Sequence, residues 1–124
     1  MPLIRSVVLA LCAASGLMRA TQSSAQGAYP DHPVKIIVAL PAGGSVDMIA
    51  RTLGQKLSVS LGQAFVVDNR AGGSGQIGMP AVSKALPDGY TLAVSPASFL
   101  TTNKSVFKTL PYDPEADFNP YRAW

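Results

Sequence analysis

The segment from Val34 to Leu61 restricts the fold more than any other part of the chain. It begins with an apolar run, Val34 to Leu40, that predicts a buried strand. A loop with Gly43 and Gly44 follows, and apolar residues then recur with the period of a helix. The residues expected on the buried face of this helix are Val46, Ile49, Ala50, Leu53 and Leu57. The segment therefore predicts a strand, a glycine loop and a helix, which together form the first half of a βαβ unit.

The position of this first glycine loop predicts the charge of a ligand. In a βαβ unit the loop lies at the carboxyl end of the strand, where open α/β sheets bind ligands. It also lies at the N-terminus of a helix, where free backbone N–H groups and the helix dipole attract anions. A small anion or carboxylate is therefore the expected ligand.

Two further pairs of strand and loop follow along the chain. Residues Ala64–Asp68 predict a second strand, which leads into a glycine-rich loop and a helix from about Gln76 to Leu86. Residues Thr91–Val94 predict a third strand, which leads into a loop rich in serine. Short connections between alternating strands and helices favour an α/β fold with a three-stranded parallel βαβαβ core, in which all three loops lie along one edge. Pro80 falls inside the second expected helix and should kink it unless the helix starts late.

Residues 1–25 have the pattern of a secretory signal peptide. Arg5 precedes a short apolar core that contains Cys12, and the small residues Ser23–Ala25 offer a cleavage site. The apolar run is shorter than the ~20 residues that a transmembrane helix needs. A buried N-terminal helix is the other interpretation. We expect export through the Sec pathway to the periplasm, and a mature chain without cysteine, which excludes disulfides and thiolate metal sites.

The distribution of charge argues against a nucleic-acid partner, although the formal net charge is +3. Two of the ten Lys and Arg residues lie in the signal segment, so the chain from Gln26 onward has eight basic residues against seven acidic ones. These charges are scattered and form no basic stripe. A hydrophobic content of 48% with 14% charged residues is that of a globular protein rather than of a disordered one.

Two enzyme patterns fit the glycine loops only in part. The stretch Gly73 to Gly78 matches the dinucleotide fingerprint G-x-G-x-x-G, but it follows the second strand, and no acidic residue lies ~20 residues later. The other interpretation is that these glycines allow positive φ angles and a close approach of the backbone. Ser45 and Ser74 lie in tight turns that lack the last glycine of the G-x-S-x-G pattern.

The lone histidine argues against both a hydrolase and a zinc protein. His32 precedes the first strand, so it belongs to the edge opposite the loops and is too far away to complete a triad with their serines. One histidine without cysteine does not make a zinc site. We therefore expect neither a catalytic triad nor a metal site.

Two charged residues near the loops each have two open roles. Asp47 either complements the dipole of the first helix or accepts hydrogen bonds from a ligand ammonium or hydroxyl group. Arg70 either pairs with a ligand carboxylate or is a solvated side chain after the second strand. The sequence does not choose between these roles.

An ordered set of short motifs resembles one known family. The motifs are Tyr29–Pro30, Pro33–Val38, Pro41–Asp47, Leu61–Gln63, Asp68–Gly75, Ile77–Gly78, Pro87–Leu92 and Leu110–Pro114. Together they resemble the extracytoplasmic solute-binding receptors of tripartite tricarboxylate transporters, the Bug or TctC-type family. The resemblance extends from Tyr29 to about Pro120.

The resemblance implies a fold, a ligand class and a partner. The fold is that of a type II-like periplasmic binding protein, in which two α/β lobes close on a small carboxylate. Loop N–H groups and hydroxyls hold the ligand, often through water, and a two-subunit membrane permease receives it. The resemblance implies a binding protein rather than an enzyme, with no cofactor and no nucleic-acid partner. The positions that match ligand-facing residues are Ala42, Gly43, Gly44, Ser45, Asp47, Gly72, Gly73, Ser74, Gly75, Ser95 and Ser98.

The resemblance also divides the chain into three parts. Residues 1–25 are the signal peptide, residues 26–120 are the first part of the first lobe, and residues 121–124 form a tail unlike anything expected there. Because the second lobe is missing, we expect a truncated or frame-shifted product, or a fragment, that binds carboxylates poorly or not at all. The alternative is a freestanding α/β structural or interaction domain without a small-molecule ligand.

Overall fold

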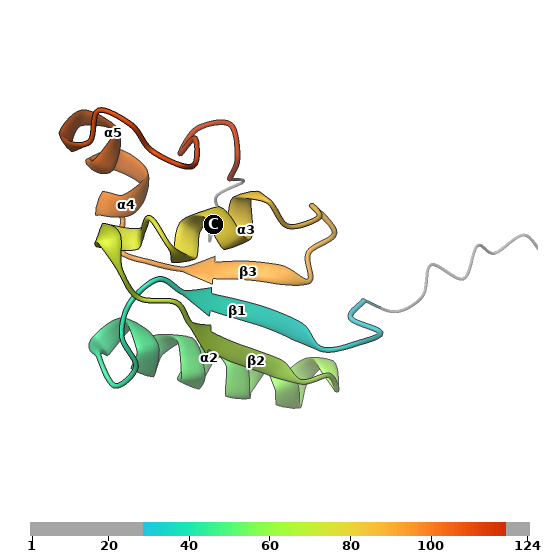
Figure 1. Cartoon of the computed structure of the whole chain (residues 1–124). Coiled ribbons are helices and arrows are strands. Elements are labelled where there is room, and N and C mark those ends of the chain that lie inside the picture. Colours follow the sequence, from blue (N-terminus) through green and yellow to red (C-terminus); the bar gives the residue numbers. More distant parts are fainter. Residues whose placement is uncertain (1–28, 119–124) are drawn as a thin grey trace, which may run out of the picture.

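A three-stranded parallel sheet forms the centre of the molecule. The computed structural model describes residues 29–118. The strands are β1 (Val34–Val38), β2 (Phe65–Asn69) and β3 (Thr91–Val94), and their arrows point in the same direction in Figure 1. The parallel βαβαβ core expected from the sequence is therefore confirmed. The expected signal peptide and the expected tail of residues 121–124 lie outside the described residues.

Strand β1 lies in the middle of the sheet, whose order is β2-β1-β3. Val34 pairs with Phe65 of β2, and Lys35 pairs with Thr91 of β3. The apolar residues of β1 are buried on both faces of the sheet, as a central parallel strand requires. The run from Val34 predicted this strand, although β1 ends at Val38 and not at Leu40.

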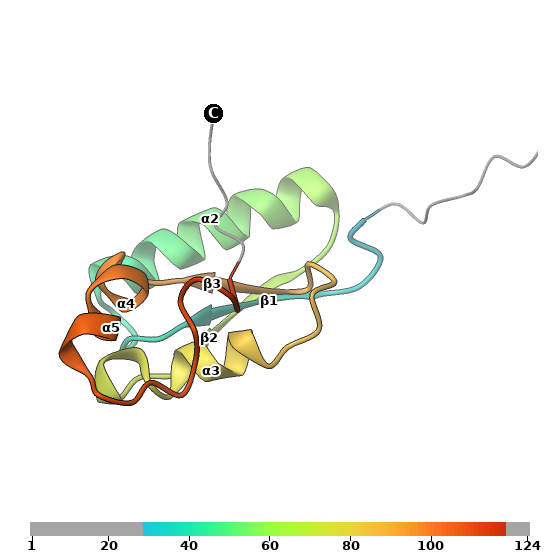
Figure 2. The same cartoon turned by 90° about the horizontal axis from the view of Figure 1, so that it is seen from above.

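Two helices cover opposite faces of the sheet. Helix α2 (Ser45–Leu61) packs on β1 and β2, and helix α3 (Gly78–Ser83) packs on β1 and β3 from the other side, as Figure 2 shows. Each helix therefore covers two of the three strands. Val66 of β2 faces the side of α3, where α3 does not reach, and it stays 53% exposed.

The face by which α2 packs on the sheet matches the predicted apolar face only in part. Ala50 is buried and Val46 packs against the core, as predicted. The buried residues of α2 are Asp47, Ala50 and Gly54, whereas Ile49 and Leu53 remain 59% and 44% exposed. Gly54 explains the difference, because a Cβ atom there would lie 3.3 Å from the carbonyl oxygen of Phe65. Small residues let the helix approach β2 closely, so the larger apolar side chains lie beside this contact.

Helix α3 is shorter than the predicted segment of about Gln76 to Leu86. It begins at Gly78 and ends at Ser83, so Pro80 lies in its first turn. The N–H groups of a first turn have no intrahelical partner, and a proline there removes no hydrogen bond. The predicted exception, a helix that starts late, therefore applies, and no kink is required.

The C-terminal part of the described chain packs on the face that α3 covers. Two one-turn helices, α4 (Ser98–Thr101) and α5 (Asn103–Val106), precede an irregular segment that returns across this face. Phe99 and Tyr112 are buried in one cluster with Ala39 and Met79.

None of the helices within residues 29–118 has the length and apolar character that a membrane-spanning helix needs.

Candidate functional site

Three loops lie along the carboxyl edge of the sheet (Figure 1), as the topology predicted. The first loop (residues 39–44) joins β1 to α2, the second loop (residues 70–77) joins β2 to α3, and the third loop (residues 95–97) joins β3 to α4. Most of the residues expected to face a ligand are exposed here: Ala42, Gly43, Gly44, Ser45, Gly72, Gly73, Ser74 and Ser98. Ser95 is half-buried, whereas Asp47 and Gly75 are buried.

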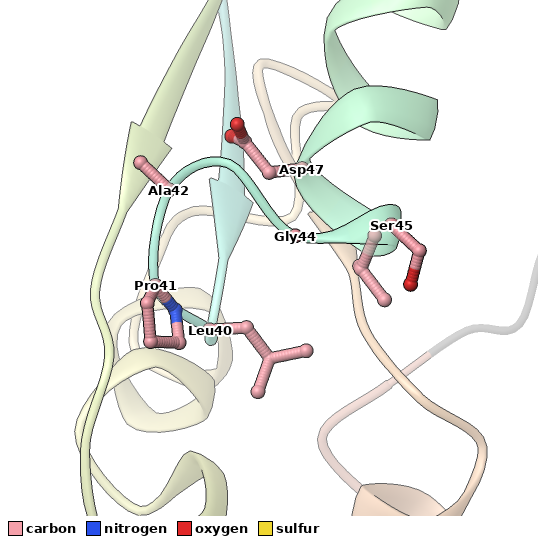
Figure 3. Close-up of a pocket in the computed structure, with 7 residues that line it drawn as sticks. Leu40, Pro41, Ala42, Gly44, Ser45 and Asp47 are labelled. Atoms are coloured by element: carbon pink, nitrogen blue, oxygen red, sulfur yellow. The ribbon is translucent and has the colours of Figure 1, made fainter.

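A pocket of about 220 Å³ lies at the junction of the first loop and α2. It is lined by Leu40, Pro41, Ala42, Gly44, Ser45, Val46 and Asp47. Figure 3 shows that the Asp47 carboxylate points toward the strands, while the Ser45 hydroxyl points away from it. No lysine or arginine lines this pocket, so the groups available to an anion are backbone N–H groups and the Ser45 hydroxyl.

The N-terminus of α2 is open at this pocket. Gly44 is the N-cap residue, and no side chain forms a capping hydrogen bond with the helix. The helix has 17 residues, so its dipole is fully developed at this end. Gly43 has a φ of +87°, which favours glycine, whereas Gly44 has a φ of −80°, which any residue adopts.

Hydrogen bonds within the protein occupy the Asp47 carboxylate. One oxygen, Oδ2, accepts from the Gly43 N–H at 2.9 Å and from Arg51 Nε at 3.0 Å. The other, Oδ1, accepts from Asn69 Nδ2 at 2.9 Å. The Arg51 guanidinium, the Gly43 N–H and the Asn69 amide together lower the pKa of Asp47 to about 2. The carboxylate is thus charged and ties the first loop to both α2 and β2.

The backbone of the second loop is left-handed over four consecutive residues. Their φ angles are +131° at Gly72, +55° at Gly73, +53° at Ser74 and +91° at Gly75. Ser74 is the only residue other than glycine with positive φ in the described part of the chain. A Cβ atom at Gly75 would lie 2.5 Å from the Phe99 ring. The glycines here provide positive φ and close packing, in agreement with the alternative to the dinucleotide fingerprint.

A buried side chain from α5 braces the second loop. Asn103 Nδ2 donates to the Ser74 carbonyl at 2.8 Å and lies 3.0 Å from the Tyr112 hydroxyl. That hydroxyl donates to the Phe99 carbonyl at 2.7 Å. Sequence reasoning missed Asn103 and Tyr112, and it also missed Arg51 and Asn69 at the first loop. Asn69 and Asn103 bond to residues 22 or more positions away, so no local pattern marks them. The i,i+4 spacing of Asp47 and Arg51 on one helix is a local signal that could have found Arg51.

Two other candidate residues lie apart from the pocket. Arg70 donates from Nε to Asp68 at 3.0 Å, so its guanidinium has a partner within the protein. His32 precedes β1, at the end of the strand opposite the loops, where it stacks on Tyr90 and contacts Asp31. The predicted separation of the histidine from the loops is therefore confirmed.

The chain is similar in sequence and in structure to known proteins. A model of the TctC family, described as the tripartite tricarboxylate transporter family receptor, matches residues 49–123 of the chain. The chain belongs to this receptor family. It is 40% identical over 119 residues to a UPF0065 protein of Bordetella bronchiseptica, an alignment that covers 95% of this chain and 36% of the relative. It is 45% identical over 93 residues to the protein BugT of Bordetella pertussis, covering 74% of this chain and 28% of BugT.

Solved structures agree with the family. An R. palustris protein with adipate is 40% identical, with a TM-score of 0.67 over 70% of this chain and 29% of that one. MatC from Rhodopseudomonas palustris, with bound malate, is 32% identical, with a TM-score of 0.70 over 74% and 31%. The periplasmic binding protein BugD has a TM-score of 0.67 at 36% identity. The chain spans about a third of the length of these receptors, so its sheet is part of one lobe of a periplasmic binding protein.

Proposed function

We propose that residues 29–118 provide part of the carboxylate-binding lobe of a periplasmic receptor in a tripartite tricarboxylate transport system. The observation that carries the proposal is the open N-terminus of α2 beside a small pocket, in a family whose matched structures include proteins with adipate and malate. The proposed ligand is a small dicarboxylate or tricarboxylate. The role is binding rather than catalysis, and the proposed partner is a two-subunit membrane permease.

The chemistry of the first loop suits a carboxylate. Free N–H groups at the end of a long helix favour a negative charge, and the loop brings them to the surface. The first loop, together with Ser45, offers one side of a binding site, and the exposed residues Gly72, Gly73 and Ser74 of the second loop extend it along the same edge. Ser95 and Ser98 add hydroxyl groups beside the third loop.

We also propose that the protein is located in the periplasm. Residues 1–25 would act as a signal for the Sec pathway, and residues 26–120 would form the first part of the binding lobe. The matched structures described as periplasmic support this location. Mass spectrometry of the exported protein should find a mature N-terminus near Gln26, whereas an intact Met1 on periplasmic protein would contradict the proposal.

A chimeric receptor tests the function directly. Residues 30–118 of this chain replace the matching segment of the adipate-bound R. palustris relative, and calorimetry measures binding of adipate, malate and citrate. We expect the chimera to bind at least one of them. A chimera that folds, by circular dichroism, but binds none of the three would contradict the proposal.

Replacement of Gly44 by Leu then tests the first loop within that chimera. A Cβ atom at Gly44 meets nothing closer than the Pro41 carbonyl oxygen at 3.8 Å, so the backbone accepts a side chain. The bulk should still keep a carboxylate from the helix N-terminus, and we expect affinity to fall by about tenfold or more, as for loss of one hydrogen bond to a charged group. Lys56→Leu, on the exposed face of α2, is the control. Equal affinity of Gly44→Leu and the parent would remove the first loop from the site.

A further inference from the structure

Asn69 connects the two glycine loops through its side chain. It is the last residue of β2, so the second loop begins directly after it. Its Nδ2 donates to the Leu40 carbonyl, within the first loop, at 3.3 Å and to Asp47 Oδ1, just after that loop, at 2.9 Å. One amide group therefore holds the first loop against the strand that carries the second.

Arg51 completes this arrangement from the next turn of α2. Its Nε donates to Asp47 Oδ2 at 3.0 Å, and its Nη2 donates to Asn69 Oδ1 at 2.9 Å. Each polar atom of the Asn69 side chain then has a partner, and Arg51 bridges the two residues that fasten the first loop. The fork geometry of a guanidinium allows this double contact, which a lysine cannot reproduce.

The charge of Arg51 also bears on an anion at the first loop. Asp47 places a buried negative charge in the first turn of α2, close to the N–H groups that an anion would approach. Without compensation this charge would repel a carboxylate. Arg51 lies against it with a side chain that is 54% exposed, so the network presents a nearly neutral surface toward the loop.

We propose that Asn69 and Arg51 are positioning residues of the carboxylate site, which hold the first loop open for the ligand and neutralise Asp47 beneath it. This inference rests on the proposed function, because it assigns these residues to the same site. In the unliganded chain, side chains from α2 and β2 hold the loop between Leu40 and Asp47 in place.

Hydrogen–deuterium exchange of the full 124-residue chain tests the first half of the inference without any ligand. Within residues 40–48, Gly43 N–H donates to Asp47 Oδ2 and Met48 N–H donates to the Gly44 carbonyl. In Asn69→Ala and Arg51→Gln, we expect exchange of these two amides to accelerate about tenfold or more, as for loss of a hydrogen bond to a charged group. Ser58→Ala is the matched control. Ser58 Oγ accepts from the Phe65 N–H at 2.9 Å, so it joins the same helix and strand at the end away from the loops. Unchanged exchange of residues 40–48 in Asn69→Ala and Arg51→Gln, or equal acceleration in Ser58→Ala, would overturn the inference.

The second half is tested with adipate by the same exchange measurement on the chimeric receptor that carries residues 30–118 of this chain, because the isolated chain is expected to bind carboxylates weakly. We expect adipate to slow exchange of residues 40–48 in the parent and in Ser58→Ala, but not in Arg51→Gln. Arg51→Lys keeps the charge and should retain part of this protection, which a purely structural role would not explain. If adipate protects the parent and Arg51→Gln equally, the positioning role is wrong while the proposed function stands. If adipate protects none of the proteins, the proposed function fails and the ligand half of the inference fails with it.

Discussion

Gly78 lies against the backbone that follows β1, where a Cβ atom would stand 2.7 Å from Ala39 Cα and 2.8 Å from the Arg70 carbonyl oxygen. Neither neighbour is a flexible side chain that could move aside. Gly44 is the opposite case, since its added Cβ would have room and its φ is ordinary. Two glycines of similar appearance in the sequence thus serve packing in one case and, under the proposed function, access of the ligand in the other.

This difference gives a prediction about stability. Gly78→Ala should lower the free energy of unfolding by roughly 1–3 kcal/mol, the usual cost of overpacking. Gly44→Ala should cost no more than about 1 kcal/mol, because alanine is a poorer N-cap residue than glycine but meets no close contact here. Urea denaturation of the two variants measures both values. Equal stability of the two variants would mean that the close contact at Gly78 is absent in solution.

Asp47 gives a prediction about acid. Its pKa is lowered from 3.8 to about 2 in the folded protein, chiefly by Arg51. A carboxylate with a lower pKa in the folded state stabilises the protein above the unfolded pKa, and this contribution disappears as the pH falls from about 3.8 through about 2. The difference in Tm between the parent and Asp47→Asn should therefore be largest above about pH 5 and should close toward pH 2.

Other carboxylates shape the acid limb of both proteins equally. The Tyr90 hydroxyl lowers the pKa of Asp31, and the N–H groups of Glu115 and Ala116 lower that of Asp113. Because these groups are present in the parent and in Asp47→Asn, thermal melts of the pair isolate the contribution of Asp47. A difference in Tm that is constant between pH 2 and pH 7 would contradict its lowered pKa.

At the scale of elements, helix α2 shows where periodicity predicts the buried face only in part, since Ala50 and Val46 pack against the core as predicted. The period of its apolar residues predicted the helix correctly, from Ser45 to Leu61, but placed Ile49 and Leu53 against the sheet. The observed contact uses Ala50 and Gly54, because close approach to β2 requires small side chains. Periodicity identifies the helix, whereas the distance between helix and sheet selects the buried side chains.

Substitutions on α2 can test which residues of the predicted apolar face pack on the sheet. Ala50 is fully buried, so Ala50→Leu should destabilise the protein by roughly 1–3 kcal/mol through overpacking. Ile49 is largely exposed, so Ile49→Lys should change the free energy of unfolding by no more than about 0.5 kcal/mol. Chemical denaturation measures both. A larger effect at Ile49 than at Ala50 would mean that Ile49 packs on the sheet in solution.

The remaining elements were predictable to the extent that their signals are local. Apolar runs in the sequence predicted the strands, and β3 was predicted with its observed bounds, Thr91–Val94. Helices α4 and α5 were missed, because four residues are too few to show a period. The glycines and serines predicted the loops, but not the side chains that hold them. Asn69 donates to residues 22 and 29 positions away, and Asn103 donates to a residue 29 positions away.

At the scale of the whole molecule, the sheet is covered unevenly. Each face carries a helix over two strands, which leaves Val66 of β2 exposed on one face and Ile49 and Leu53 exposed on α2 itself. Exposed apolar groups of this kind favour association. We expect the purified chain to associate as its concentration rises, measured by sedimentation velocity, and Ile49→Lys with Leu53→Lys to reduce this. A chain that stays monomeric at all concentrations would contradict the expectation.

The isolated chain should also bind carboxylates weakly. The described residues offer loops from one lobe, so a ligand would remain in contact with water, where each hydrogen bond contributes little net free energy. We expect calorimetry with adipate, malate and citrate to show no binding in the micromolar range. Micromolar binding by the 124-residue chain would mean that these loops alone form a complete site.

The position of a bound carboxylate tests most directly whether the first loop is part of the binding site. The measurement is a crystal structure of the chimeric receptor with adipate, in which residues 30–118 come from this chain. We expect one adipate carboxylate within hydrogen-bonding distance of the N–H groups at the start of α2, with Asp47 still held by Arg51 and Asn69. Adipate bound with both carboxylates away from the first and second loops would contradict the assignment of this edge as the binding site.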